Sequence, residues 1–371
     1  MKVFKGLTWD HPRGYKPLQA WAEADKSATV EWSIQKLEGF ESHPINELAE
    51  TYDLLIVDNP GIGEAAEEKC LRPLEDFLSA EQMRFLKQSS MGSSFESYCY
   101  KGQHWAIPID AASQVCAVAG DASDAIPLTW NAVQLYAWSN PGRVALSLGG
   151  PHALLTFYSI CQSLGGTLFE GNEFVLEPQI GIRALDMMND IFLRQQKDLI
   201  DLNPIGLLDE MAKGTFDLCP AIFGYVNYSS PTTGRMVLFT DIPHCGNPAL
   251  RGSVLGGTGL AVSVNCEPEP ALIEHIMRYV SDEVQRSLVV ESGGQPSNAA
   301  AWQYDRANDL TQGFFSNTFD TVSNAYVRPK YHGYIPFQDT SSAIIRRGLA
   351  ENRQSSEILS DVKNNHARYR P

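Results

Sequence analysis

The stretch YDLLIVDNP, residues 52–60, decides the fold class of this chain. Its centre, Leu54–Val57, is a continuous apolar run, and Asn59-Pro60-Gly61 follows it as a turn signal. A short apolar run bounded in this way is typical of a strand that is covered on both faces, as in a parallel sheet packed between helices. The stretch therefore predicts an α/β fold with this strand near the centre of the sheet.

The residues before this stretch alternate between strand and helix patterns. Val3–Thr8 and Val30–Ile34 are predicted strands, and Pro17–Ala24 is a predicted helix with its proline at or near the first position. Residues 9–15 form a predicted loop between the first strand and that helix. Strands that alternate with helices indicate βαβ units and a largely parallel sheet.

The residues after it extend the pattern. The proline-containing segment Gly102–Asp110 leads into an apolar strand at Gln114–Ala119, and a further strand is predicted at Ser253–Val262. Helical patterns lie at residues 131–139, 153–164, 182–194 and 270–290 and in the tail after Thr340.

Length and charge limit the possible functions. A chain of 371 residues is expected to form two or three domains. The formal net charge of −15 argues against nucleic acid as a partner, because such binding needs clustered Lys and Arg. Seven scattered cysteines without a CxxC pair argue against a disulfide framework and a structural zinc site and favour a reducing compartment. We therefore expect no metal and no cofactor.

The amino-terminal residues do not have the pattern of a secretory leader. A strand pattern starts directly after Met1, and no charged segment followed by an apolar h-region precedes it. No stretch approaches the ~18 apolar residues of a transmembrane helix. We expect a cytoplasmic protein as the sequence stands, and a periplasmic or extracellular one if a leader has been removed.

Six segments, in order, carry a resemblance to one known family. They are residues 52–58 with 71–77, 102–110 with 115–119, 129–131, 163–169, 256–262 and 292–297. Together they resemble the extracellular solute-binding proteins of ABC importers, of the carbohydrate, maltose-binding-like kind. The chain departs from the family pattern at Trp9–Gly14, at Asn131 and at Ser297, and the sequence as it stands is expected to be leaderless.

The resemblance implies an α/β, two-lobed, periplasmic-binding-protein-like fold of type II, with a hinge between the lobes and a ligand cleft. Lobe 1 is expected to comprise residues 1–110 and 255–303, and lobe 2 residues 111–254 and 304–371. The lobes would close on a ligand by hinge motion. Parallel α/β sheets also bind ligands at the carboxyl ends of their strands, so the loops after the strands become candidate site residues.

The loop after the first strand supplies five candidate ligand-binding residues. Trp9 and Tyr15 offer aromatic faces, Asp10 accepts hydrogen bonds from hydroxyls, and Arg13 can bind a carboxylate or phosphate in bidentate fashion. His11 adds a group that titrates near neutral pH. The alternative is an ordinary polar loop with a capping Asp and a structural Arg.

Three further candidates follow or lie in predicted strands. Asp58 and Asn59 end the apolar strand, where they either bind ligand or cap and turn the chain. Asp110 lies in the crossing segment, where it either meets ligand or only anchors the geometry of the hinge.

The remaining candidates come from later in the chain. The resemblance implies an aromatic residue from the second lobe, here Tyr225, with core packing as the alternative. Gly256, Gly257 and Thr258 could let backbone amides approach an oxygen-rich ligand, or simply form a tight turn. The isolated histidines are predicted to be ordinary surface or packed residues; they are His104, His152 and His244.

Two functions of different classes follow. The first is a monomeric binder of a small polar solute, a sugar or a related hydroxylated or anionic compound, that delivers it to an ABC permease. The second is a leaderless cytoplasmic enzyme or sensor that acts on a carboxylate or acyl substrate, with His11, Asp10 and Arg13 as the catalytic residues.

Overall fold

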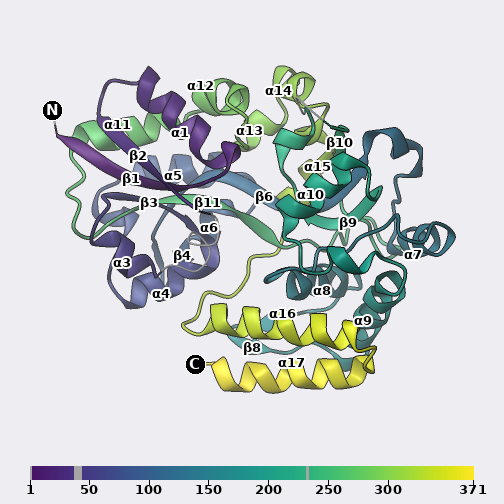
Figure 1. Cartoon of the computed structure of the whole chain (residues 1–371). Helices are drawn as coiled ribbons and strands as arrows, with labels where there is room; N and C mark the ends of the chain where they lie inside the picture. Colours follow the sequence, from purple (N-terminus) through teal and green to yellow (C-terminus); the bar gives the residue numbers. More distant parts are fainter. Residues whose placement is uncertain (1, 37–43, 231–233) are drawn as a thin grey trace. The chain divides into compact units, whose positions relative to one another are not determined.

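The computed structural model describes residues 2–36, 44–230 and 234–371 and divides them between two compact units (Figure 1). Unit 1 comprises Met1–Ala112 and Gly256–Ser316, and unit 2 comprises Ser113–Leu255 and Asn317–Pro371. Both contain strands and helices, which confirms the predicted α/β class. The lobe boundaries predicted from the sequence concern two lobes that move relative to each other on ligand binding. They remain a prediction.

The sheet of unit 1 is mixed, whereas the strand–helix alternation predicted a largely parallel one. β1 (Val3–Trp9) pairs in parallel with β2 (Thr29–Gln35) and β3 (Leu54–Asp58). On the other side of β3, β11 (Leu255–Val262) runs antiparallel. The chain enters β11 directly from unit 2, at the edge where β1 and β3 end, so no crossover helix precedes it.

Helix α1 spans Pro12–Ala24, five residues longer at its start than predicted. His11 is its N-cap residue, with Nδ1 accepting a hydrogen bond from the N–H of Arg13. Pro12 occupies the first helical position, which suits its fixed φ and missing N–H, and Pro17 lies inside the helix. The predicted start at Pro17 was therefore wrong, because a cap by a histidine side chain gives no familiar sequence signal.

The remaining described helices and short strands of unit 1 are the following. They are α3 (Ile45–Ala49), α4 (Ile62–Glu67), α5 (Ala80–Ser89), α6 (Ser94–Ser97), β4 (Cys99–Tyr100), β5 (Gln103–His104), α11 (Pro270–Tyr279), α12 (Asp282–Val284), α13 (Ala299–Trp302) and α14 (Asp305–Leu310). The helix predicted over 270–290 is broken after Tyr279, and Ser281 caps α12 before a π-helical turn at Gln285–Val289. One core cluster joins Leu55 and Val57 of β3 to Ile62 of α4.

The sheet of unit 2 is built on the second half of β6 (Ile107–Ala119), a strand buried at all thirteen residues. β9 (Leu218–Phe223) and β10 (Val237–Thr240) both pair antiparallel with it. The long side chains of this unit form one large core cluster that includes Trp130, Phe157 and Phe337.

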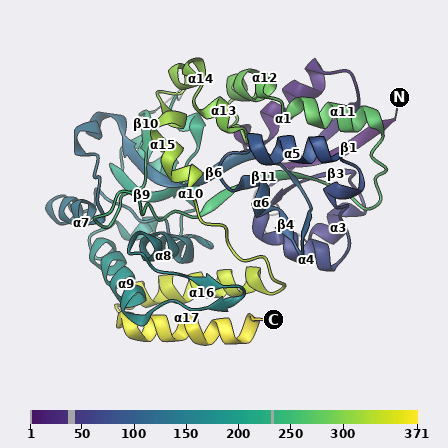
Figure 2. The same ribbon diagram turned by 180° about the vertical axis from the view of Figure 1, so that it is seen from behind.

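Helices enclose that sheet, and α16 and α17 lie side by side in both views (Figures 1 and 2). The helices and the small hairpin of unit 2 are α7 (Trp130–Ser139), α8 (His152–Ser163), β7 (Phe169–Glu170), β8 (Glu173–Phe174), α9 (Pro178–Phe192), α10 (Pro204–Lys213), α16 (Tyr334–Ala350) and α17 (Ser355–Tyr369). The helix α15 (Phe314–Ser323) runs across the third boundary between the units, at Ser316/Asn317.

Two strands carry the chain from one unit to the other. β6 leaves unit 1 after Ala112, and β11 enters it at Gly256. We call these the crossing strands. All seven cysteines are free, and none of the described helices is long and apolar enough to span a membrane.

Candidate functional site

The carboxyl ends of β1 and β3 meet the start of β11 at one edge of the unit 1 sheet. Between β1 and β3 the register pairs Gly6 with Leu54, so continuing it places Asp10 opposite Asp58, where β3 ends. Between β3 and β11 it pairs Asp58 with Thr258. Most of the candidate residues therefore come from one place in unit 1. We call this place the ligand edge of unit 1.

Trp9 and His11 form a packed aromatic pair at this edge. Their ring centroids lie 5.3 Å apart with planes 12° from parallel, and the Arg13 guanidinium carbon lies 5.9 Å from the Trp9 ring centroid. A Cβ atom on Gly14 would lie 2.3 Å from Trp9 Nε1, so only glycine fits there. The segment predicted as a loop is in fact the end of a strand and the tightly packed first turn of α1.

The charge of Arg13 is neutralised inside the protein. Its Nε donates to Oδ2 of Asp110 at 2.7 Å and its Nη2 donates to Oδ1, a bidentate pair. The two side chains are 4% and 8% exposed. This pairing argues against the hypothesis that Arg13 binds an anionic ligand. It favours the alternative in which Asp110 anchors the geometry of the hinge.

His11 is held in its neutral form. Burial and, secondarily, the charge of Arg13 lower the pKa of His11 to about 3. Since Nδ1 accepts the capping hydrogen bond, the neutral ring carries its hydrogen on Nε2. At neutral pH the imidazole is then a hydrogen-bond donor at the ligand edge and a very weak base.

Asp58 and Asn59 differ in their surroundings. Oδ1 of Asp58 accepts a hydrogen bond from the N–H of Asn59 at 2.8 Å, which is a turn role, and the side chain is half-buried. Asn59 is 0% exposed, yet neither its Nδ2 nor its Oδ1 has a hydrogen-bond partner among the described residues. A buried amide without partners costs free energy, which makes Asn59 a candidate for a contact with ligand or water.

Replacing Asn59 with leucine tests that reading. Asn59→Leu keeps the volume and removes the two unpaired polar groups, so the free energy of unfolding without ligand is expected to rise by about 1–2 kcal/mol. Denaturant unfolding measures it. Asn46→Leu, at a half-buried Asn whose Oδ1 accepts from the N–H of Glu47, serves as the control and is expected to change stability by less. A loss of stability in Asn59→Leu would contradict the reading.

The other candidates of unit 1 are more accessible. Asp10 is exposed, whereas Tyr15, Gly256 and Gly257 are half-buried. Thr258 is buried in the sheet opposite Asp58. The structure brings Asp10, which is exposed, and Asp58, which is half-buried, to the same edge of the sheet.

Unit 2 has a comparable edge at the end of β9. Phe223, the last residue of β9, packs edge-on against His152 with ring centroids 5.7 Å apart, and Tyr225 follows two residues later. His152 begins α8, and its Nδ1 has no hydrogen-bond partner among the described residues. We call this place the ligand edge of unit 2.

His152 was missed by the sequence analysis, which treated it as an ordinary histidine. Burial and then the charge of Arg328 lower its pKa to about 3, so it is also neutral. The available signal was Gly149-Gly150-Pro151, a turn that leads into a helix after an apolar segment. His152 is isolated in the sequence, and it lies at this edge because α8 packs against β9.

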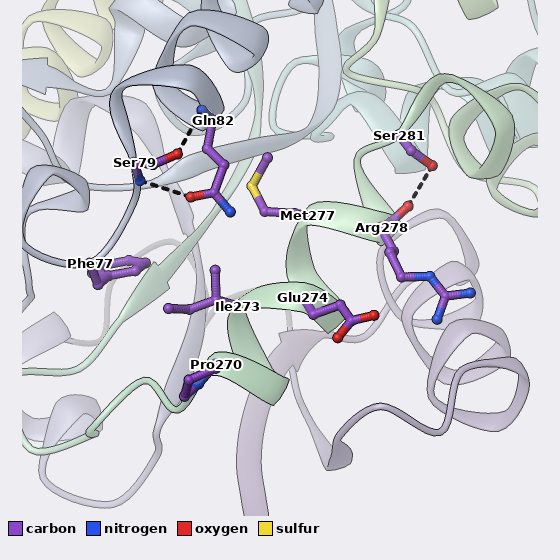
Figure 3. Close-up of a pocket in the computed structure, with 9 residues that line it drawn as sticks. All are labelled: Phe77, Ser79, Gln82, Pro270, Ile273, Glu274, Met277, Arg278 and Ser281. Atoms are coloured by element: carbon purple, nitrogen blue, oxygen red, sulfur yellow. Dashed lines mark hydrogen bonds between the residues drawn. The ribbon is translucent and has the colours of Figure 1, made fainter.

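A shallow groove of about 550 Å³ lies elsewhere in unit 1, between the start of α5 and α11. Figure 3 shows Phe77, Ile273 and Met277 facing it, and Ser79 and Gln82 of the α5 capping box border it. None of the predicted site residues lines this groove, so we do not assign it to ligand binding. Among the described residues, no three His, Cys, Asp or Glu side chains cluster as metal ligands.

Solved structures match this chain over its whole length. The ribitol complex of an ABC transporter solute-binding protein from Agrobacterium radiobacter is 17% identical, covers 99% of this chain and 98% of its own, and has a TM-score of 0.81. The maltose-bound MalE3 of T. maritima is 16% identical, with 99% of each chain covered and a TM-score of 0.81.

This chain has the fold of the ABC transporter solute-binding proteins.

A third structure with that fold, the α-D-tagatose complex of a solute-binding protein from Thermotoga lettingae, is 17% identical over 100% of both chains, with a TM-score of 0.78. No protein-family model and no curated protein sequence matches the chain. The solute-binding-protein fold predicted from the six sequence segments is thus confirmed by structure, at identities too low to carry the ligand across.

Proposed function

We propose that this protein binds a neutral, hydroxylated small molecule, a polyol or a sugar, and serves as the substrate-binding component of an ABC importer. The observation that carries the choice of ligand is the Arg13–Asp110 pair, because it removes the cation with which the ligand edge could hold an anion. The same edge carries the carboxylates of Asp10 and Asp58 and the neutral ring of His11. Carboxylates accept hydrogen bonds from hydroxyl groups and repel anions.

The solved structures support the same class of ligand. Proteins with this fold hold ribitol, maltose, α-D-tagatose and D-mannitol. The proposed location of the protein is outside the cytoplasmic membrane, and its proposed partner is the permease of the importer. Closure of the two units on the ligand would form the surface that the permease recognises.

The enzyme alternative has less support. It requires His11 to take up a proton near neutral pH, but a pKa of about 3 and a capping role for Nδ1 make this ring a poor base. It also requires Arg13 to hold a carboxylate substrate, and Asp110 already occupies that guanidinium.

A thermal-shift screen tests the proposed function. Ribitol, D-mannitol, α-D-tagatose and maltose form the first set, and small carboxylates and phosphates form the second. A ligand at 100 times its Kd adds about 2.7 kcal/mol of stability, which raises Tm by a few degrees. Shifts in the first set, with the compound recovered unchanged, support the proposal. Shifts confined to the second set, or consumption of the compound, would overturn it.

Removing the carboxylates should weaken binding of whichever first-set compound raises Tm most. Asp10→Asn and Asp58→Asn each remove a charged acceptor, and hydrogen bonds to charged groups contribute about 1.5–3 kcal/mol, so Kd is expected to rise roughly 10- to 100-fold. Isothermal titration calorimetry measures Kd. Glu81→Gln, an exposed position on α5, is the matched control and should leave Kd unchanged. Equal affinities in all three variants would remove these carboxylates from the site.

A further inference from the structure

The crossing strand β6 is anchored inside unit 1 just before it leaves. Asp110 lies two residues before the boundary at Ala112, and its carboxylate is held by both Nε and Nη2 of Arg13. A bidentate guanidinium–carboxylate pair fixes orientation as well as distance. Since both side chains are buried, this contact is shielded from competing water and salt.

Neighbouring residues of β6 are held in the same unit by side chains from the loop after the π-helical turn. Gln295 Nε2 donates to the carbonyl oxygen of Ala111 at 3.0 Å, and Ser297 Oγ donates to that of Pro108 at 2.8 Å. Gln285 in the π-helical turn accepts from the N–H of Ser297 at 2.8 Å. These contacts therefore fix the backbone of residues 108–111 within unit 1.

The crossing strand β11 is anchored inside unit 2 in a parallel manner. Arg328 is buried, its Nη2 donates to the carbonyl oxygen of Leu255 at 3.4 Å, and its Nη1 donates to Oε1 of Gln338 at 2.9 Å. Leu255 is the last residue of unit 2 before the boundary. The N–H of Leu255 in turn donates to the carbonyl oxygen of Tyr326 at 2.8 Å.

Each buried arginine also acts on the histidine at the ligand edge of its own unit. The N–H of Arg13 donates to His11 Nδ1, and its guanidinium lies over Trp9. In unit 2, the charge of Arg328 contributes to the lowered pKa of His152. In unit 1, Arg13 thus links residues of the ligand edge to a crossing strand by direct contacts.

We propose that Arg13 and Arg328 are positioning residues, each holding one crossing strand in place beside the ligand edge of its own unit, and that together they set how readily the two units close on a ligand. This rests on the proposed function as a solute binder. The buried pair Arg13–Asp110 is then retained for geometry, since apolar residues of similar volume can replace a buried ion pair without loss of stability.

The test compares two doubly substituted full-length proteins with the wild type. Arg13→Met with Asp110→Leu removes the anchoring pair and keeps the volume. Arg143→Met with Asp217→Leu is the matched control, because Arg143 also binds Asp217 through Nε (2.7 Å to Oδ2) and Nη2, away from the boundary residues of the crossing strands. Circular dichroism establishes that both proteins are folded.

Hydrogen–deuterium exchange and ligand affinity are then measured. In the first variant, the amide exchange rate over residues 107–112 is expected to rise at least about tenfold. The Kd for ribitol, D-mannitol, α-D-tagatose or maltose is expected to change at least about fivefold, which is in the range of allosteric couplings. The control should change neither. Wild-type exchange in the folded variant, or raised exchange with an unchanged Kd, would overturn the proposal.

Two further measurements distinguish failure of this proposal from failure of the variant to fold and from failure of the proposed ligand class. If the first variant does not fold, Arg13→Lys and Arg328→Lys retain the charge but lose the planar fork. Faster exchange over 107–112 in the former and over 253–258 in the latter supports the proposal, and unchanged exchange in both refutes it. If the wild type binds none of the four probes, the proposed ligand class fails, while the exchange comparison still decides whether the arginines anchor the strands.

Discussion

Lowering the pH from 7 to 4 is expected to cost the folded protein about 6 kcal/mol through two histidines alone, roughly 3 kcal/mol each. His11 and His152 both have a pKa of about 3 when folded, against the ordinary 6.5. A histidine with a depressed pKa stabilises the fold fully above its unfolded value. That stability is lost as the pH falls from 6.5 towards 3, because the unfolded chain binds the protons first.

Guanidinium unfolding at pH 7 and pH 4 measures this loss. His11→Asn keeps an N-cap acceptor, and His152→Gln keeps a polar side chain, but neither titrates in this window. The doubly substituted protein should lose about 6 kcal/mol less than the wild type between the two pH values, since other groups titrate alike in both. An equal loss in the two proteins would show that these imidazoles are accessible to protons in the folded state.

The second large effect is expected at Gly257, where an alanine should destabilise the protein by about 4 kcal/mol. The backbone there has φ of +98°, and a Cβ atom would lie 2.4 Å from the carbonyl oxygen of Asp110. Strain from the positive φ and a collision with backbone atoms therefore add. Since Asp110 is held by Arg13, the backbone has little freedom to move away.

Gly246→Ala separates the two causes. Gly246 also has a positive φ, +105°, but a Cβ atom there would meet no atom within 4 Å. We expect it to cost only the strain, about 1–3 kcal/mol. Thermal or denaturant unfolding of both variants gives the difference. If Gly257→Ala is no worse than Gly246→Ala, the close approach of Gly257 to the backbone of Asp110 adds nothing to the cost of the positive φ.

Much of the fold could be predicted because its strongest signals are local. Leu54–Val57 is buried on both faces, so its apolar run is unmistakable, and β3 lies where expected. The start of α1 could not be predicted, because Pro12 and Pro17 give the same signal and only the capping contact of His11 decides between them. The direction of β11 depends on the unit from which the chain enters it, and a short sequence pattern carries no information about that path.

The candidate site was predicted less well, for a physical reason. The sequence places Arg13 and Asp110 at the right elements, but their pairing spans 97 positions and turns two supposed ligand contacts into one internal contact. His152 has no distinctive neighbours in the sequence and becomes a candidate only beside Phe223. Local patterns locate strand ends; they do not say which polar groups there are already used by the protein itself.

The pairing of β3 with β11 bears on how this protein is made in the cell. The strand partners Asp58 and Thr258 are separated by 200 positions of chain, so at 5–20 residues per second the ribosome needs about 10–40 s to supply the second after the first. Throughout that interval the apolar strand Leu54–Val57 has one edge without its final neighbour. A growing chain of this protein is therefore a natural client for chaperones that shield open strand edges, and translation stalled before residue 255 leaves an aggregation-prone fragment.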